Sequence, residues 1–224
     1  MVRHPVNLRT IAILAVVLLL VVGVTTSDPL HRAVIDILGA AERVMRAYPR
    51  GGMLLFLLLA GLSAMLSFFS TAALVPVGVY VWGSTTTMLL LWSGGVLGGI
   101  GGYWFARTLG RRAVTHTFPA ASLRPYEIFF SRQASWRTIL IFRIALQSEL
   151  PSYVLGLVTY PFLRYVPIIM LAEAIFVMLE VLLGEAFINR SGTTFAVLLV
   201  VGVAMTVWAW KRLQREMAAA RTET

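Results

Sequence analysis

Four stretches of the chain are apolar over a length that suits a membrane-spanning helix. They run from Thr10 to Thr26, from Met88 to Ala106, from Tyr165 to Phe187 and from Phe195 to Trp210. A helix needs about 20 apolar residues, and at least about 17, to cross the hydrocarbon core of a bilayer. The pattern therefore predicts four full transmembrane helices in an all-α fold. The first stretch, with its basic flank, also fits a signal peptide, but no Ala-x-Ala cleavage pattern follows, which favours a retained helix over 1–27.

Two further apolar segments are interrupted by polar residues and proline. Residues 51–82 contain the run Ser67–Thr71 and then Pro76, and residues 138–162 contain Pro151 among polar and charged side chains. A proline removes a backbone donor and breaks a helix, so we expect both segments to be broken within the bilayer. Backbone groups freed at such a depth need protein or water as partners, and a hairpin buried in a helix bundle provides them.

The segments at the two ends of this core are more polar. Residues 28–50 place apolar side chains at helical spacing opposite charged ones, which is typical of an amphipathic helix on the membrane surface. The apolar set is Val34, Ile37, Leu38, Ala41, Val44 and Met45, and the charged set is Arg32, Asp36, Arg43 and Arg46. Residues 211–224, after the last span over 188–210, form a basic tail that we expect to fray.

The distribution of arginine decides the predicted topology. Loop 107–137 carries six arginines and one acid. If both interrupted segments crossed the membrane, this loop would face outward, against the positive-inside rule. If each instead enters and leaves by the same face, loop 107–137 and both termini are cytoplasmic. We therefore expect two opposed re-entrant hairpins, at about 51–82 and 138–162, within a core over 51–187.

Composition excludes several classes of site. Hydrophobic residues make up 58% and charged residues 13%, so lipid must cover much of the surface. The chain has no cysteine, and its three histidines lie outside the apolar spans, so neither a metal site nor a cofactor is predicted. The net charge of +9 comes from residues between spans, with no separate basic domain to hold a nucleic acid. Juxtamembrane arginines that fix topology account for it, and attraction to anionic lipids is the functional alternative.

Charged residues inside the apolar segments are the candidate functional groups. Arg143 and Glu149 lie six residues apart in the second interrupted segment. A charge held in the membrane is costly and marks a functional site by default. Arg143 could bind a phosphate or carboxylate through its planar fork, or the two residues could form a structural ion pair. Pro151 breaks the helix nearby, and would expose backbone donors beside them.

Two glutamates share one face of the third predicted span. Glu173 and Glu180 are seven residues apart, with no cation within one turn of either. A carboxylic acid in an apolar environment can gain and lose a proton near neutral pH, so proton coupling is one hypothesis. Pairing with Arg143 or Arg107 in the folded bundle is the other. Arg137 and Arg164 flank the second hairpin, where they could anchor it at the interface or gather lipid phosphates.

The glycines of the span at 88–106 predict close helix packing. Gly94, Gly98 and Gly102 recur every four residues, a spacing that lets two helices approach closely in lipid. The partner helix could belong to the same chain or to a second copy, so a homo-oligomer is possible. The apolar spans contain no histidine that could act as a base, and the sequence shows no serine-hydrolase motif. We therefore predict that the protein is not an enzyme.

Two stretches resemble the DedA family, also called the VTT-domain or SNARE-associated Golgi protein family. Residues 98–111, GGIGGYWFARTLGR, are similar to its glycine-rich segment that ends in Gly-Arg. Residues 143–162, RIALQSELPSYVLGLVTYPF, are similar to its second hairpin, with Arg143, Pro151, Gly156 and Phe162 at the family positions. The similar region spans about 56–184.

The resemblance implies two opposed re-entrant hairpins and a role in lipid movement. Bacterial members are associated with the return of undecaprenyl phosphate across the membrane, and eukaryotic relatives act as phospholipid scramblases. Many members carry an acid before the first hairpin proline, as Glu-x-x-x-Pro, whereas no acid stands in residues 70–75 here. Glu149, Glu173 or Glu180 would have to supply it.

The leading hypothesis is a lipid flippase or scramblase in a bacterial cytoplasmic membrane. Arg143 would hold the phosphate of the head group, and Glu149 with Glu173 would tune or protonate the site. The alternatives are a small-solute or ion transporter that uses the same hairpins, and a membrane scaffold without transport activity.

Overall fold

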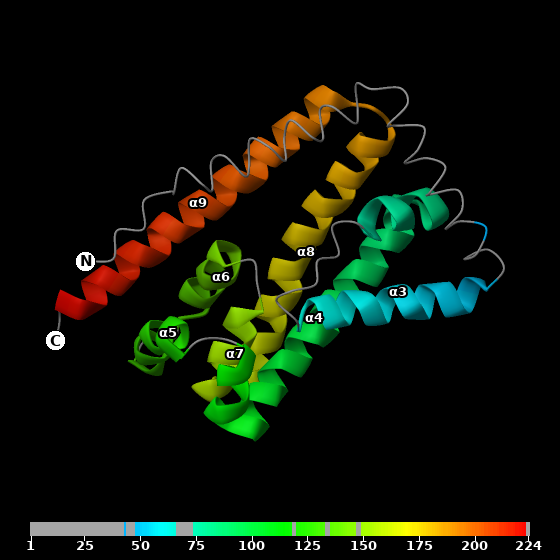
Figure 1. The fold of residues 1–224 in the computed structure, drawn as a ribbon. Helices are drawn as coiled ribbons and strands as arrows, with labels where there is room; N and C mark the ends of the chain where they lie inside the picture. Colours follow the sequence, from blue (N-terminus) through cyan, green and yellow to red (C-terminus); the bar gives the residue numbers. More distant parts are fainter. Residues whose placement is uncertain are drawn as a thin grey trace.

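The part of the chain described by the computed structural model is helical throughout its regular elements. It comprises residue 43 and residues 48–65, 74–117, 120–132, 135–146 and 149–222. Seven helices occur in these ranges and no strand: α3 (Pro49–Ser63), α4 (Leu74–Thr117), α5 (Ala120–Arg132), α6 (Trp136–Ala145), α7 (Leu150–Leu157), α8 (Phe162–Ile188) and α9 (Gly192–Thr222) (Figure 1). The predicted first span and nearly all of the predicted surface helix at 28–50 lie outside the described residues.

Three of the described helices are long and apolar enough to cross a membrane. They are Val75–Arg111 within α4, Phe162–Ile188, and Gly192–Ala220 within α9. Each contains one of the full spans predicted from the sequence. The prediction of an all-α integral membrane protein is confirmed.

The helix α4 is the centre of the bundle. It packs against α3, α7 and α8, while α9 lies alongside α8 and also contacts α6 (Figure 1). The larger apolar core lies where α4, α6, α7 and α8 meet, around Phe142, Leu155, Tyr165 and Ile169. A smaller core around Phe56 and residues of α4 and α8 fills the other side.

The first interrupted segment consists of α3 and the start of α4, up to Gly83. Gly83 has φ 77° and ψ 167°, a backbone conformation that favours glycine, and α4 bends there. The rings of Phe56 in α3 and Trp82 in α4 meet edge to face at 5.4 Å, so the two arms lie against each other. This contact is what a helical hairpin requires, although the membrane face on which it opens stays a prediction.

The sequence had suggested that Pro76 breaks a helix near its middle. In the structure, Pro76 lies in the first turn of α4. The amide groups of a first turn have no partner within the helix, so the missing N–H of proline costs nothing there. Pro76 therefore starts the second arm, and the interruption of the segment precedes it. After the bend at Gly83 the residues of α4 are again helical.

The second interrupted segment consists of two short helices. The arms α6 and α7 have 10 and 8 residues, and the break lies between Ala145 and Leu150, with Pro151 in the first turn of α7. At 1.5 Å per residue these arms measure about 15 Å and 12 Å. Neither can cross a hydrocarbon core of about 30 Å, as the prediction of a re-entrant hairpin requires.

The C-terminal tail does not fray within its described length, contrary to expectation. Helix α9 continues through the basic segment to Thr222. Residues 211–220 are mostly good helix formers, and Arg212 forms an i,i+4 ion pair with Glu216 at 3.1 Å. Leu213 of this extension is buried in the larger apolar core, and this packing holds the extension against the bundle.

The glycines of α4 divide into two faces with different partners. Gly94 and Gly98 lie against α3, where a Cβ at Gly98 would collide with the Gly61 carbonyl oxygen and lie 2.7 Å from the Cβ of Ala64. Gly102 instead lies against α7, at ordinary contact distance from the Tyr153 ring. Both faces are thus occupied by helices of the same chain, so a homo-oligomer would have to use a different surface.

A matching close approach fixes α7 on α4. Gly156 of α7 is buried, and a Cβ there would collide with the backbone carbonyl of Tyr103 and lie 2.9 Å from the Cβ of Ala106. Gly156 therefore serves helix packing, beside its place in the second hairpin.

We expect Gly98→Ala to destabilise the protein by about 1–3 kcal/mol, because a backbone atom of α3 would have to move. Gly101→Ala is the matched control, since its nearest neighbour is the flexible thioether of Met65 at 3.1 Å, and it should change stability little. Thermal unfolding in detergent, followed by tryptophan fluorescence, measures both. Equal melting temperatures for the two variants would contradict the assigned packing.

Candidate functional site

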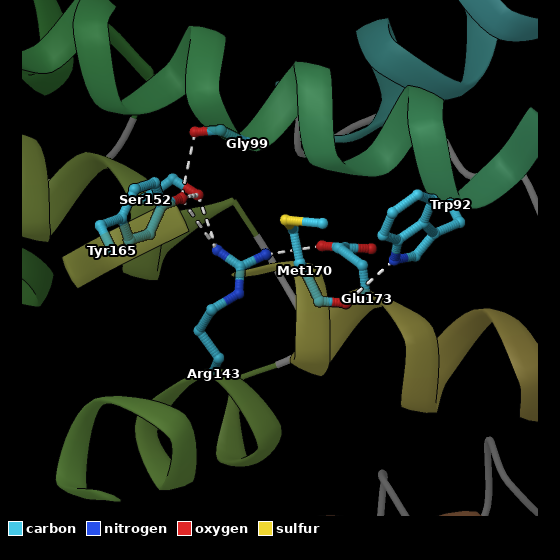
Figure 2. A network of polar contacts seen from close by, with 7 residues as sticks. All are labelled: Trp92, Gly99, Arg143, Ser152, Tyr165, Met170 and Glu173. Carbon is cyan, nitrogen blue, oxygen red and sulfur yellow. Dashed lines mark hydrogen bonds and ion pairs between the residues drawn. The ribbon is translucent and has the colours of Figure 1, made fainter. Parts of the chain in front are cut away.

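Arg143 is a buried charge at the end of the first arm of the second hairpin. It lies in the last turn of α6 and is 7% exposed. One terminal nitrogen donates to the Glu173 carboxylate at 2.6 Å, and the other donates to Ser152 Oγ at 2.9 Å and to the Tyr165 hydroxyl at 3.3 Å. Figure 2 shows the guanidinium between these partners, which come from α7 and α8. Arg143 therefore joins three helices.

The hydroxyl groups of this network are tied to α4. Ser152 Oγ and the Tyr165 hydroxyl lie 2.9 Å apart, and Tyr165 donates to the carbonyl oxygen of Gly99 at 3.1 Å (Figure 2). A backbone carbonyl has two lone pairs, so Gly99 can accept this bond in addition to its helical one. The Tyr165 ring also stacks on Tyr103, with centroids 5.0 Å apart and planes at 17°.

Glu173 fits into a space left by a glycine of α4. A Cβ at Gly95 would lie 2.6 Å from the Oε2 atom of Glu173. Any larger residue at position 95 would push the carboxylate away from Arg143. One turn earlier on α8, the Met170 carbonyl accepts a bond from the Trp92 indole at 2.9 Å, which fixes α8 against α4 at this level (Figure 2).

A cavity of about 130 Å³ adjoins this network. The four charged residues proposed above as functional groups of the apolar segments line it: Arg143, Glu149, Glu173 and Glu180. The rest of the lining comes mainly from α3, α4 and α8, so both interrupted segments contribute to its walls. Carboxylates outnumber the arginine three to one.

The pairing of these charges was left open by the sequence. Arg143 forms an ion pair with Glu173, 30 residues further along the chain. Pairing with Arg143 was one of the two hypotheses for Glu173. Glu149, nearer in sequence, lines the same cavity from the break between α6 and α7. Glu180 lines this cavity and also an apolar pocket of about 330 Å³ beside Pro76 and Phe195.

Two predicted site residues lie outside the cavity. Arg137 is exposed in the first turn of α6, with its guanidinium 5.5 Å from the ring of Trp136. Arg164 is exposed in the first turn of α8, where its positive charge partly offsets the rise that burial causes in the pKa of Tyr160. Both positions suit interfacial anchors.

Several residues of the network were not expected from the sequence. Ser152 and Tyr165 are ordinary residues in their helices, and Gly95 and Gly99 are two further glycines of the predicted span at 88–106. The signal that could have found Ser152 is its position directly after Pro151, in the first turn of the second arm. Tyr165 carries no comparable signal.

Comparison with known families gives a match over the same region. The protein-family model of the VTT domain matches residues 69–186, more than half of the chain. This chain belongs to the VTT-domain (DedA) family. Its VTT domain includes every residue of the Arg143 network and nearly all of the cavity apart from α3. A search of curated proteins found no match, and a search of solved structures found none either.

The family assignment supports a transporter-like or lipid-related role in the membrane. The VTT domain is not known as an enzymatic domain, but the prediction that the chain is not an enzyme stays a prediction. The described residues contain no cluster of three or more metal-ligating side chains, and the metal and cofactor predictions are likewise untested.

We expect Glu173→Gln to cost about 3–5 kcal/mol of stability, because it leaves Arg143 buried without its carboxylate. The double variant Arg143→Met/Glu173→Gln removes both charges and should recover most of that loss. Glu216→Gln, which breaks the exposed pair with Arg212, is the control and should cost less than about 1 kcal/mol. Thermal unfolding of the three variants in detergent tests this, and a double variant no more stable than Glu173→Gln would contradict it.

Proposed function

We propose that this protein moves a phosphate-bearing lipid, such as a phospholipid or undecaprenyl phosphate, between membrane leaflets. It would act as a flippase or scramblase in a bacterial cytoplasmic membrane, with both termini in the cytoplasm. The observation that carries the proposal is the guanidinium of Arg143, buried at a helix break and lining a polar cavity. Arginine is suited to such a site because its fork matches the oxygens of a phosphate.

The ion pair with Glu173 supplies a reason for proton coupling. A phosphate and the Glu173 carboxylate would compete for the same nitrogen of Arg143, so the ligand needs Glu173 to withdraw or to be protonated. Protonation removes the charge that holds the arginine, and it also lowers the repulsion between the carboxylates and an anionic head group. Proton uptake and phosphate binding would therefore favour each other.

The size of the cavity indicates that transport requires movement. At about 30 Å³ for each water molecule, its 130 Å³ holds about four waters, less than a complete phospholipid head group needs. Both α3 and the break between α6 and α7 contribute to the wall, so a separation of these two elements would enlarge the cavity. Arg137 and Arg164, exposed near the ends of the second hairpin, would gather lipid phosphates before entry.

Transport in liposomes tests the role of Arg143. The full-length protein, reconstituted with labelled phospholipid or labelled polyprenyl phosphate, should move at least one of them faster than empty liposomes do. Arg143→Gln should reduce the rate to that of empty liposomes while the protein remains folded. The exposed Arg212→Gln, in α9, should retain transport. Full activity of Arg143→Gln would refute the proposed head-group site. Wild-type protein that moves no labelled lipid faster than empty liposomes would refute transport and favour a scaffold role.

The pH dependence of transport tests the role of Glu173. The wild-type rate should change with pH or with an imposed proton gradient, since protonation of Glu173 frees Arg143. Glu173→Gln mimics the protonated acid and should make the rate insensitive to pH. A variant as pH-dependent as the wild type would place the coupling elsewhere.

A second candidate function rests on the excess of carboxylates. A cavity with three glutamates and one arginine favours a proton or a small cation over an anion when all four groups are ionised. A pH-sensitive dye in the same liposomes separates the two candidates. Proton flux without movement of any labelled lipid would favour the ion transporter.

A further inference from the structure

A second hollow, of about 500 Å³, lies at the far end of α4, away from the Arg143 network. The end of α4, α5 and α7 form its walls. One part of the lining is polar, with Arg107, Arg111, Glu127 and Ser131, and another part is apolar and includes Leu157. The lining is therefore amphipathic, because charged and apolar side chains border the same space.

Arg107 is held in place from one side. One of its terminal nitrogens donates to the Tyr103 hydroxyl and, at 3.5 Å, to the Tyr160 carbonyl, while the guanidinium lies 5.7 Å from the rings of Tyr103 and Trp104. Within the described part of the chain its other nitrogens make no hydrogen bond. A guanidinium fixed in this way presents its remaining donors with little loss of freedom on binding.

Arg111 reaches the same hollow from beyond a bend. Gly110 has φ 72° and ψ −171°, a conformation nearly confined to glycine, and it redirects α4 just before Arg111. Arg111 pairs with Glu127 of α5 at 3.3 Å and remains half exposed. The two arginines outnumber the single acid, so the lining keeps one positive charge in excess.

The hollow lies where a membrane-spanning helix ends. The apolar span of α4 ends at Arg111, and the large ring of Trp104, about two turns before, is 44% exposed. Exposed tryptophan is typical of the head-group level of a bilayer. A ligand at this level can place an anionic group against the arginines and keep its hydrocarbon beside the apolar wall.

We propose that this hollow binds the phosphate group of an anionic phospholipid at the membrane interface. The site is distinct from the Arg143 cavity and does not depend on transport. A lipid fits better than a soluble phosphate because part of the lining is apolar and the hollow opens at the end of a membrane span. The predicted topology places it in the cytoplasmic leaflet, where anionic lipids attract basic residues.

Photo-crosslinking of the full chain in nanodiscs tests the site. The probe is a phosphatidylglycerol with a photoreactive head group, at low density in phosphatidylcholine, and the crosslinked peptides are mapped by mass spectrometry. We expect adducts on the end of α4, on α5 or on the end of α7. Unlabelled phosphatidylglycerol should compete, whereas inorganic phosphate and additional phosphatidylcholine should not.

Three variants give the test its controls. Arg111→Gln and Arg107→Gln should each lower crosslinking about fivefold, the effect expected for one basic residue near a membrane surface. Arg111→Gln leaves the contacts of Arg107 with Tyr103 intact, so a folding defect of Arg107→Gln would not obscure the result. Arg212→Gln is the matched control, because Arg212 is also about half exposed and paired with a glutamate.

Arg143→Gln separates this site from the transport proposal, and it should leave the crosslinking unchanged. Displacement of the probe by inorganic phosphate would overturn the assignment to a lipid. Crosslinking that Arg111→Gln and Arg212→Gln reduce equally would show a general attraction to arginine and would overturn the site.

Discussion

Arg143 and Glu173 form an ion pair inside a bundle that hydrocarbon surrounds, and the packing of four helices satisfies these two charges. Leaving either charge without its partner would be costly, so Ser152 and Tyr165 complete the hydrogen bonds of the guanidinium. Gly95 provides the space for the carboxylate on α4. The network thus fixes α6, α7 and α8 against the central helix, and the same bonds that hold the hairpin in place hold the group proposed to bind a head group.

The membrane spans and the candidate charges could be predicted because each depends on local sequence. Apolar runs of sufficient length are visible directly, and a charge within such a run is conspicuous. The partners could not be predicted in the same way. Arg143 forms an ion pair with Glu173, which lies 30 residues away in sequence, and only the packing of α8 against α6 brings these two side chains together. Tyr165 carries no sequence signal, and Ser152 has only its position after Pro151, since a hydroxyl group becomes part of a site through its neighbours.

The prolines and the basic tail have a place in their helices that residue type alone did not give. Pro76 and Pro151 each lie in the first turn of the second arm of their segment rather than inside a helix, and the basic tail, expected to fray, extends α9. In both cases residue type was read without its place in the helix. A proline is harmless in a first turn, and residues such as lysine and arginine end a membrane span without ending the helix that carries it.

The extension of α9 places the C-terminal part of the chain in contact with α6, the arm that carries Arg143. Ala209 and Leu213, on either side of Lys211, belong to the same core as Ile139 and Phe142 of α6. The arm that carries Arg143, α6, therefore packs against α9, which continues as a helix to Thr222. A displacement of α6 would have to tilt α9 or break the packing between the two helices. The position of α6, and with it that of Arg143, is thus coupled to the tilt of the C-terminal helix through the packing that they share.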